Sequence, residues 1–232
     1  MAYVIQEPKR AALPVAGTGD LFPIRRVYCV GRNFAAHARE MGHDPDREPP
    51  FFFLKPADAL QPIPEGGTAE HPYPPQTSDY HFELEMVVAL AKGGRDIPLE
   101  RALDCVYGYG IGLDMTRRDR QQEAKDLRRP WDLGKSADLS GPVGPIYPVA
   151  KVGHPGKGAV TLTVDGQVRQ KADLSQMIWS VAEQISFLSQ YFELAGGDVI
   201  FAGTPEGVGK VERGQTMVGQ IEGLGEIRLK VV

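Results

Sequence analysis

The chain has 232 residues, a formal net charge of −4 from 26 Lys and Arg against 30 Asp and Glu, and 42% hydrophobic residues. These values fit a globular domain and exclude a largely disordered chain. The mild acidity argues against nucleic acid as a partner, and no apolar run approaches the ~20 residues that cross a bilayer.

The first third of the chain is cut into short segments by proline and glycine. We expect residues 1–22 to form an extended arm, residues 26–30 a strand, residues 33–41 a helix and residues 51–55 an aromatic strand. The proline- and glycine-rich residues 62–79 are typical of a long loop or a turn-rich edge.

Strands also dominate the remainder. The expected elements are strands at 81–91, 105–114, 199–202 and 226–232, short and charged helices at 99–102 and 116–126, a hairpin at 160–170 with Asp165-Gly166 at its turn, and an amphipathic helix at 175–192. The regular alternation of strands and helices that builds parallel sheets is missing. The sequence therefore predicts an α+β fold that is predominantly β, with residues 23–232 as one catalytic domain after the arm.

Glu83 and Glu85 are two positions apart in a predicted strand, so their carboxylates should share one face. Asp114 ends a glycine-rich predicted strand and offers a third carboxylate. Three oxygen ligands without Cys or His suit a hard divalent cation, Mg²⁺ or else Mn²⁺ or Ca²⁺. The alternative is that the glutamates line the wet face of an edge strand and that Asp114 caps a turn.

His37 and Glu40 are spaced i, i+3 in the predicted helix at 33–41, so imidazole and carboxylate can touch. A carboxylate that accepts from one ring nitrogen orients the histidine and raises its basicity, so that the pair could activate a water. The alternative is an ordinary contact on a solvated helix face.

Basic residues follow the acidic ones. Arg117, Arg118 and Arg120 come directly after Asp114, and Lys135 lies further on. Cations beside a metal site could hold an anionic substrate. The alternative is a charged surface helix, because residues 117–129 mix both signs.

Two further features bear on function. Residues 201–209 (FAGTPEGVG) combine a strand end with a glycine-rich turn whose backbone N–H groups can hold a carboxylate. Cys29 and Cys105 lie in apolar segments, which suits buried thiols in a reducing compartment. Because the N-terminus also lacks a signal-peptide pattern, we expect a cytoplasmic protein without a membrane partner.

Taken together and in order, these motifs resemble the fumarylacetoacetate hydrolase superfamily. The resemblance rests on VYCVGRNFAAH at 27–37, FFLKP at 52–56, HFELE at 81–85, GLDMTRRD at 112–119, KS at 135–136 and GTPEGVG at 203–209. It implies a mixed β-sandwich roll of the C-terminal domain type of this superfamily, and a homodimer. Two positions depart from the pattern, Phe34 where Tyr is common and Ala202 where Thr is common.

The resemblance also implies roles for individual residues. It implies Mg²⁺ on Glu83, Glu85 and Asp114, and a His37–Glu40 dyad with Lys135 in the active site. The positions that it implies near a bound ligand are Arg32, Arg118, Gln121, Lys55 and Thr204.

The implied activity is Mg²⁺-dependent hydrolysis of a C–C bond in an acylpyruvate, with fumarylpyruvate of the gentisate route giving fumarate and pyruvate. A 2-oxo dicarboxylate also fits the charges, because three carboxylates and one divalent cation leave one negative charge that Lys135 and Arg118 outweigh. Open alternatives are acylpyruvase or oxaloacetate decarboxylase activity, isomerisation of a 2-hydroxy-diene-dioate, and non-catalytic binding of a 2-oxo acid.

Overall fold

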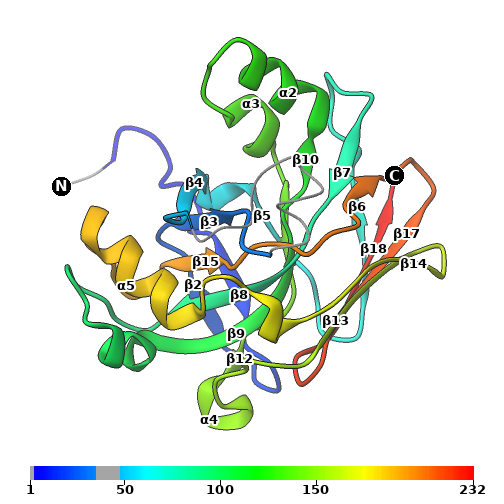
Figure 1. Ribbon diagram of the computed structural model, residues 1–232. Coiled ribbons are helices and arrows are strands. Elements are labelled where there is room, and N and C mark those ends of the chain that lie inside the picture. The colour runs from blue at the N-terminus through cyan, green and yellow to red at the C-terminus, as the bar shows by residue number, and fades with distance from the viewer. Residues whose placement is uncertain (1–2, 35–47) are drawn as a thin grey trace.

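The computed structural model describes residues 3–34 and 48–232, and strands dominate it (Figure 1). The strands are β1 (Ala12–Pro14), β2 (Leu21–Pro23), β3 (Val27–Gly31), β4 (Phe51–Lys55), β5 (Leu60–Pro62), β6 (Thr68–His71), β7 (Tyr80–Phe82), β8 (Leu84–Leu90), β9 (Val106–Leu113), β10 (Thr116–Arg117), β11 (Gly141–Val143), β12 (Tyr147–Pro148), β13 (Ala159–Val164), β14 (Gln167–Asp173), β15 (Val199–Phe201), β16 (Gly209–Lys210), β17 (Thr216–Ile221) and β18 (Gly225–Val231). The helices are η1 (Ala57–Ala59), η2 (Leu99–Cys105), α2 (Arg118–Asp126), α3 (Asp132–Lys135), α4 (Val149–Val152), η3 (Leu174–Gln176) and α5 (Val181–Tyr191).

The large sheet has the strand order β4-β3-β15-β8-β9-β11-β5, and β12 pairs with β9. Its central strand β8 is buried along its whole length. A continuous apolar run such as Met86–Leu90 is expected where a strand is covered on both faces. The antiparallel pairing of β8 with β9 sets Glu85 opposite Gly112, and this register later positions the acidic residues.

A second sheet with the order β14-β13-β17-β18-β6 curls beside the large one (Figure 1). Burial alternates along β13, as expected for a strand with one face on the core. Met86 and Ile111 of the large sheet share one hydrophobic core with Leu162, Met217 and Leu229 of the second sheet. The predicted fold class, α+β and predominantly β, is confirmed.

Several local predictions hold. The strand at 51–55 is β4, and the hairpin β13–β14 turns at Asp165 and Gly166, whose φ angles are +48° and +78°. Two consecutive residues with positive φ suit the tight turn that matches the twist of paired strands. Cys29 and Cys105 are both buried and free, as predicted.

The helix predicted at 175–192 is shorter in the structure. α5 begins at Val181 because the side chain of Ser180 accepts from the backbone of Glu183, and Glu183 in turn accepts from the backbone of Ser180. Upstream, the N–H groups of Ile178 and Trp179 donate to Asn33 instead of to helical carbonyls. A long-range contact therefore replaces the first turns of the predicted helix.

The strand predicted at 81–91 is interrupted at Glu83, which lies between β7 and β8. The Leu84 N–H donates to the side chain of Gln170 at 3.0 Å, and the Glu83 carbonyl accepts from the Asp114 N–H at 2.8 Å. The premise that Glu83 and Glu85 share one regular strand is therefore wrong. For the helix predicted at 33–41, residues 35–41 lie outside the described residues, and Phe34 forms a bridge with Met177.

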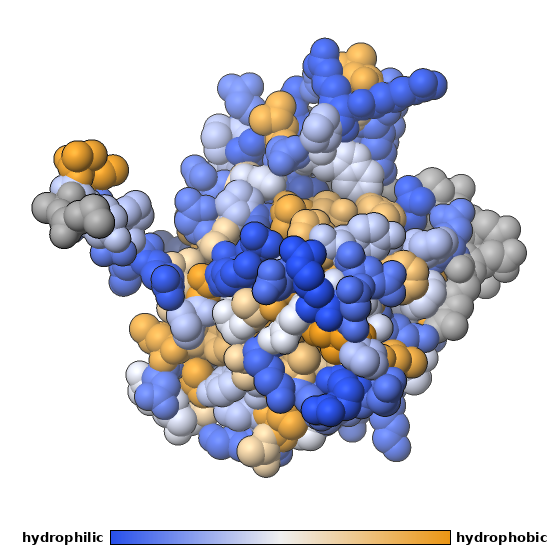
Figure 2. Space-filling model, turned by 90° about the vertical axis from the view of Figure 1, so that its left-hand side faces the viewer, coloured by the Kyte–Doolittle hydropathy of each residue, from blue (hydrophilic) through white to orange (hydrophobic). Residues whose placement is uncertain are grey.

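The predicted arm at residues 1–22 joins the body from Ala12 onward, where β1 pairs with β2. Leu13 and Phe22 are buried in a second core cluster with Val199 and Phe201. The exposed residues before this hairpin project from the body (Figure 2). Within the described residues, no helix is long and apolar enough to span a membrane.

Candidate metal centre and its pocket

The three predicted acidic residues meet at one end of the β8–β9 pair. Glu83 precedes β8, Glu85 is its second residue, and Asp114 follows β9. One carboxylate oxygen from each lies within 4.8 Å of the others, and all three side chains are buried. The alternative of a wet strand face is therefore wrong. The antiparallel register, rather than the two-residue spacing, brings residues 83 and 85 to residue 114.

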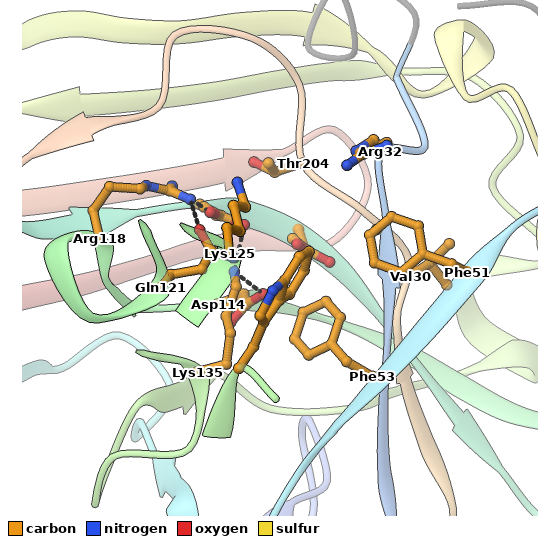
Figure 3. A pocket seen from close by; sticks show the side chains of 14 residues that line it. Val30, Arg32, Phe51, Phe53, Asp114, Arg118, Gln121, Lys125, Lys135 and Thr204 are labelled. Carbon is orange, nitrogen blue, oxygen red and sulfur yellow. Dashed lines mark hydrogen bonds and ion pairs between the residues drawn. The ribbon is translucent and has the colours of Figure 1, made fainter. Parts of the chain in front are cut away.

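Three cations compensate this cluster. Nζ of Lys135 lies 2.9 Å from Glu83 Oε2 and 2.7 Å from Asp114 Oδ2. Nζ of Lys55 lies 2.9 Å from Asp114 Oδ1, and a guanidinium nitrogen of Arg118 lies 2.5 Å from Glu83 Oε1. Figure 3 shows Lys135 and Asp114 turned toward each other on the pocket floor. Without a metal, three carboxylates thus face three positive side chains.

The buried charges perturb one another. Burial, and then repulsion by Asp114 and Glu83, raises the pKa of Glu85 well above its usual range. For Lys135, burial alone would lower the pKa, but the carboxylates of Asp114 and Glu83 outweigh it and raise the pKa above the usual value. A carboxylate held among like charges gains most from a nearby divalent cation, so the cluster fits a metal electrostatically.

The donor set also fits a hard cation. All three ligands are carboxylates, which suit Mg²⁺ or Mn²⁺ better than softer metals. Asp114 Oδ1 is buried and, despite its proximity to Lys55, has no hydrogen bond within the described residues. Such an oxygen is expected where a ligand completes the site.

The glycine-rich loop after β15 holds a carboxylate of the chain itself. The Gly203 N–H donates to Glu85 Oε2 at 2.6 Å. Gly203 has a φ of +97°, and a Cβ there would lie 2.5 Å from the Cβ of Asn33. Glycine is therefore required both by backbone conformation and by space.

Asn33 joins this loop to the end of β3. Its side chain donates to the carbonyl of Ala202 at 2.7 Å and to that of Trp179 at 2.9 Å, and it accepts from the Trp179 N–H at 2.8 Å. The buried amide thereby fixes the backbone next to Arg32, which has a φ of +58°. Sequence reasoning did not single out Asn33.

Helix α2 presents one face to the pocket. Arg118, Gln121 and Lys125 are spaced i, i+3 and i+7 and all line it. Arg118 donates to Gln121 Oε1 at 2.7 Å, and its Nε lies 3.4 Å from Nδ1 of His81. Arg118 is thus part of the site, whereas much of the remaining helix surface is charged and solvated.

Aromatic rings form another part of the pocket lining. Phe51 meets Trp131 edge-on with ring centroids 5.5 Å apart, and Phe53 lies 5.8 Å from Trp131. The guanidinium of Arg32 lies 5.2 Å from the Phe51 ring centroid, and Nζ of Lys125 lies 5.4 Å from that of Trp131. These rings and cations line one pocket together with the three acidic residues.

Thr204 also lines the pocket, and its hydroxyl is already bound within the protein. It donates to the carbonyl of Leu84 at 2.9 Å and accepts from Gln170 Nε2 at 2.9 Å. Its remaining lone pair leaves it able to accept one further hydrogen bond.

Lys55 is fully buried and does not line the pocket. Its ammonium donates to the Met115 carbonyl at 3.2 Å, to Ser140 Oγ at 3.0 Å and to the Lys135 carbonyl. The contacts make Lys55 an internal counter-charge for Asp114. His37 and Glu40 lie outside the described residues.

Sequence reasoning missed Lys125 as a pocket residue. Burial, and then the positive charges of Arg118 and Arg32, lowers its pKa below the usual range. The signal was present in the sequence, because Lys125 is seven residues after Arg118 and four after Gln121 and so belongs to the same helix face.

Residues 26–232 match the family model described as fumarylacetoacetate (FAA) hydrolase C-terminal. The chain belongs to the fumarylacetoacetate hydrolase family. The match covers almost the whole chain and confirms the family resemblance and the type of fold.

Several proteins are similar to this chain over most of its length. A crystal structure of fumarylpyruvate hydrolase from Pseudomonas aeruginosa in complex with Mn²⁺ and pyruvate is 56% identical, covers 100% of this chain and 99% of that one, and superposes with a TM-score of 0.98. Fumarylpyruvate hydrolase from Ralstonia sp. is 42% identical over 82% of this chain and 98% of its own length. The human mitochondrial oxaloacetate tautomerase FAHD1 is 41% identical over 89% of this chain and 91% of its own length.

Proposed function

We propose that this protein is a divalent-metal-dependent hydrolase that cleaves fumarylpyruvate into fumarate and pyruvate. The observation that carries the proposal is the buried cluster of Glu83, Glu85 and Asp114 at the floor of a cationic pocket. Support comes from the fumarylpyruvate hydrolase of P. aeruginosa, which shares 56% of its sequence with this chain and whose structure contains Mn²⁺ and pyruvate.

We propose Glu83, Glu85 and Asp114 as the metal ligands and Mg²⁺ as the native metal, with Mn²⁺ as a substitute. When bound, the metal would act as a Lewis acid toward the 2-oxo acid end of the substrate. The surrounding charges then favour a dianion. Lys55, Lys135 and Arg118 already balance the three carboxylates, so a divalent metal leaves an excess of two positive charges. Fumarylpyruvate carries two carboxylates and supplies the matching negative charge.

Lys135 has the geometry of an oxyanion donor. Two of its three ammonium hydrogens are directed to Glu83 and Asp114, so the third remains for a substrate oxygen. As the C3–C4 bond breaks, the pyruvate part takes up negative charge, and a fixed ammonium in a buried site stabilises that charge. Arg118 and Gln121 offer further polar contacts from α2.

We assign the hydrolytic base to His37, oriented by Glu40. In this role His37 takes a proton from water, the resulting hydroxide adds to the C4 carbonyl carbon, and the pyruvate part leaves and is protonated at C3. The proposal rests on the i, i+3 spacing of the pair and on its place in the chain. Arg32 precedes the pair, Phe51 follows it, and both line the pocket.

Oxaloacetate is a second candidate substrate, because the human relative at 41% identity is named for a reaction of oxaloacetate. Its decarboxylation would need the same stabilisation of a pyruvate anion but no attacking water.

We make a separate proposal for the oligomeric state of the protein. We expect a homodimer, which sedimentation velocity tests directly.

The deciding experiment measures turnover of fumarylpyruvate, acetylpyruvate and oxaloacetate by one preparation, before and after EDTA and after Mg²⁺ or Mn²⁺ is restored. We expect fumarylpyruvate to be cleaved fastest, activity to disappear with the metal, and either metal to restore it. Turnover that survives metal removal would overturn the role of the carboxylate cluster. Turnover of oxaloacetate alone would replace hydrolysis by decarboxylation or tautomerisation, and binding of oxalate without any turnover would indicate a non-catalytic protein.

A further inference from the structure

The cations of the pocket fall into two groups. Lys135 and Arg118 are each bound to carboxylates of the metal cluster. Arg32 and Lys125 line the same pocket, and among residues 3–34 and 48–232 no carboxylate lies within ion-pair distance of either, although Glu48 attracts Arg32 and Glu83 attracts Lys125 from further away. Figure 3 shows them entering from opposite sides, Arg32 from the end of β3 and Lys125 from α2. Two unpaired cations that converge on one space favour an anion there.

The two side chains are held rather than free in solvent. Lys125 is partly buried, and its ammonium lies against the Trp131 ring. Arg32 lies over Phe51, and its backbone is fixed by the neighbouring Asn33. Cations that rest on aromatic rings keep a defined position while their donors stay available to a ligand.

Phe51, Phe53 and Trp131 line the same pocket as these cations and the metal cluster. These rings offer an apolar wall, which suits a flat carbon chain better than a hydrated charge. The pocket therefore combines the acidic cluster, an apolar wall and two cations that are not ion-paired with the cluster. A substrate with one carboxylate at each end of an unsaturated chain matches that combination.

We propose that Lys125, assisted by Arg32, binds the terminal carboxylate of the substrate and makes the enzyme select acylpyruvates that end in a carboxylate over those that end in a methyl group. The proposal rests on the proposed hydrolysis of acylpyruvates and adds a determinant of substrate choice. Lys125 contacts the end of the substrate that does not react, so its loss should weaken binding more than it slows bond cleavage.

The test uses Lys125→Met, which keeps the length of the side chain and removes its charge. With the Mn²⁺-loaded enzyme, we expect kcat/KM for fumarylpyruvate to fall about 10- to 100-fold, as for the loss of a hydrogen bond to a charged group, mainly through KM. Acetylpyruvate, which lacks the terminal carboxylate, should be cleaved as by the wild type. Lys125→Arg should retain most of the preference for fumarylpyruvate over acetylpyruvate.

Arg120→Met is the matched control. It removes a charge from the same helix, but the Arg120 side chain pairs with Glu123 and does not line the pocket.

A binding experiment separates this inference from the proposed reaction. Calorimetric titration of the metal-loaded protein compares 2-oxoheptanedioate with 2-oxoheptanoate, which have equal chain lengths and differ in the terminal carboxylate. Lys125→Met should lose affinity for the dicarboxylate alone, whether or not the wild type cleaves fumarylpyruvate. Equal losses for both acids, or no loss for either, would overturn the inference. Failure of the wild type to turn over any acylpyruvate would overturn only the proposed reaction.

Discussion

The ammonium of Lys135 lies 2.7 Å from Oδ2 of Asp114 in the protein interior. The same ammonium also pairs with Glu83, so in the absence of a metal one positive charge is shared between two of the proposed metal ligands. Lys135 therefore has two connected roles. It compensates the acidic cluster in the metal-free protein, and in the proposed reaction it would also donate a hydrogen bond to the substrate.

Replacing Lys135 by Met should make folding depend on the metal. Removing one member of a buried charged pair costs about 3–5 kcal/mol, so the metal-free variant should unfold at a lower temperature than the wild type. A divalent cation restores the lost compensation. Thermal unfolding with EDTA and with Mn²⁺ should therefore show a larger metal-induced shift in Lys135→Met than in the wild type, together with loss of hydrolysis. Equal shifts in both proteins would refute the competition between Lys135 and the metal.

The Glu85→Gln variant should separate metal affinity from folding. The amide oxygen can still accept from the Gly203 N–H, while the charge that burial and the neighbouring carboxylates disfavour is removed. The metal-free protein should consequently be as stable as the wild type or more so. Replacing a residue that only hydrogen-bonds to a metal-ligating side chain lowers metal affinity about 10- to 100-fold. Loss of a metal ligand itself should therefore lower the affinity by the upper end of that range. Titration with Mn²⁺ measures the affinity, and an unchanged value would remove Glu85 from the ligand set.

A methyl group at Gly203 should damage both fold and site. Gly203→Ala places a Cβ 2.5 Å from Asn33 on a residue with a φ of +97°, and strain of this kind costs about 1–3 kcal/mol. The shift would also disturb the N–H that binds Glu85. Gly156→Ala is the matched control, because a Cβ there meets no atom within 4 Å. Urea unfolding and Mn²⁺ binding should change in the first variant only, and similar effects in both would argue against a special role for this turn.

His71 should make the protein less stable in mild acid. It is fully buried, its Nδ1 lies 2.7 Å from Gln61 Oε1 and its Nε2 lies 2.9 Å from the Tyr80 hydroxyl. Burial, and then the charge of Lys55, lowers its pKa from 6.5 to about 4. The unfolded chain therefore binds a proton near pH 6.5 that the folded protein does not. Stability from this group is complete above pH 6.5 and falls by about 3 kcal/mol as the pH drops to 4.

Urea unfolding of wild type and His71→Gln between pH 4 and pH 7 measures this contribution. The variant cannot titrate in this range, so the difference in unfolding free energy between the two proteins should shrink or reverse as the pH falls. A difference that is constant with pH would show that His71 is not the titrating group.

Much of this protein follows from its sequence alone. Apolar runs such as Met86–Leu90 specify buried strands, and Asp165-Gly166 specifies a tight turn, because these preferences act over a few residues. The order of the motifs identified the family, and the residue types of Glu83, Glu85 and Asp114 suggested a hard metal.

Other features were decided only by tertiary structure. Pairing of β8 with β9 brings Glu85 to Asp114, Lys55 reaches Asp114 from 59 residues away, and contacts with Asn33 stop the helix at 175–192 from forming its first turns. Its spacing from Arg118 and Gln121 placed Lys125 on the helix face that lines the pocket. Only the packing of Lys125 against Trp131 showed where its charge lies. Local propensity cannot encode such contacts, because they depend on which distant segments become neighbours when the whole core is buried.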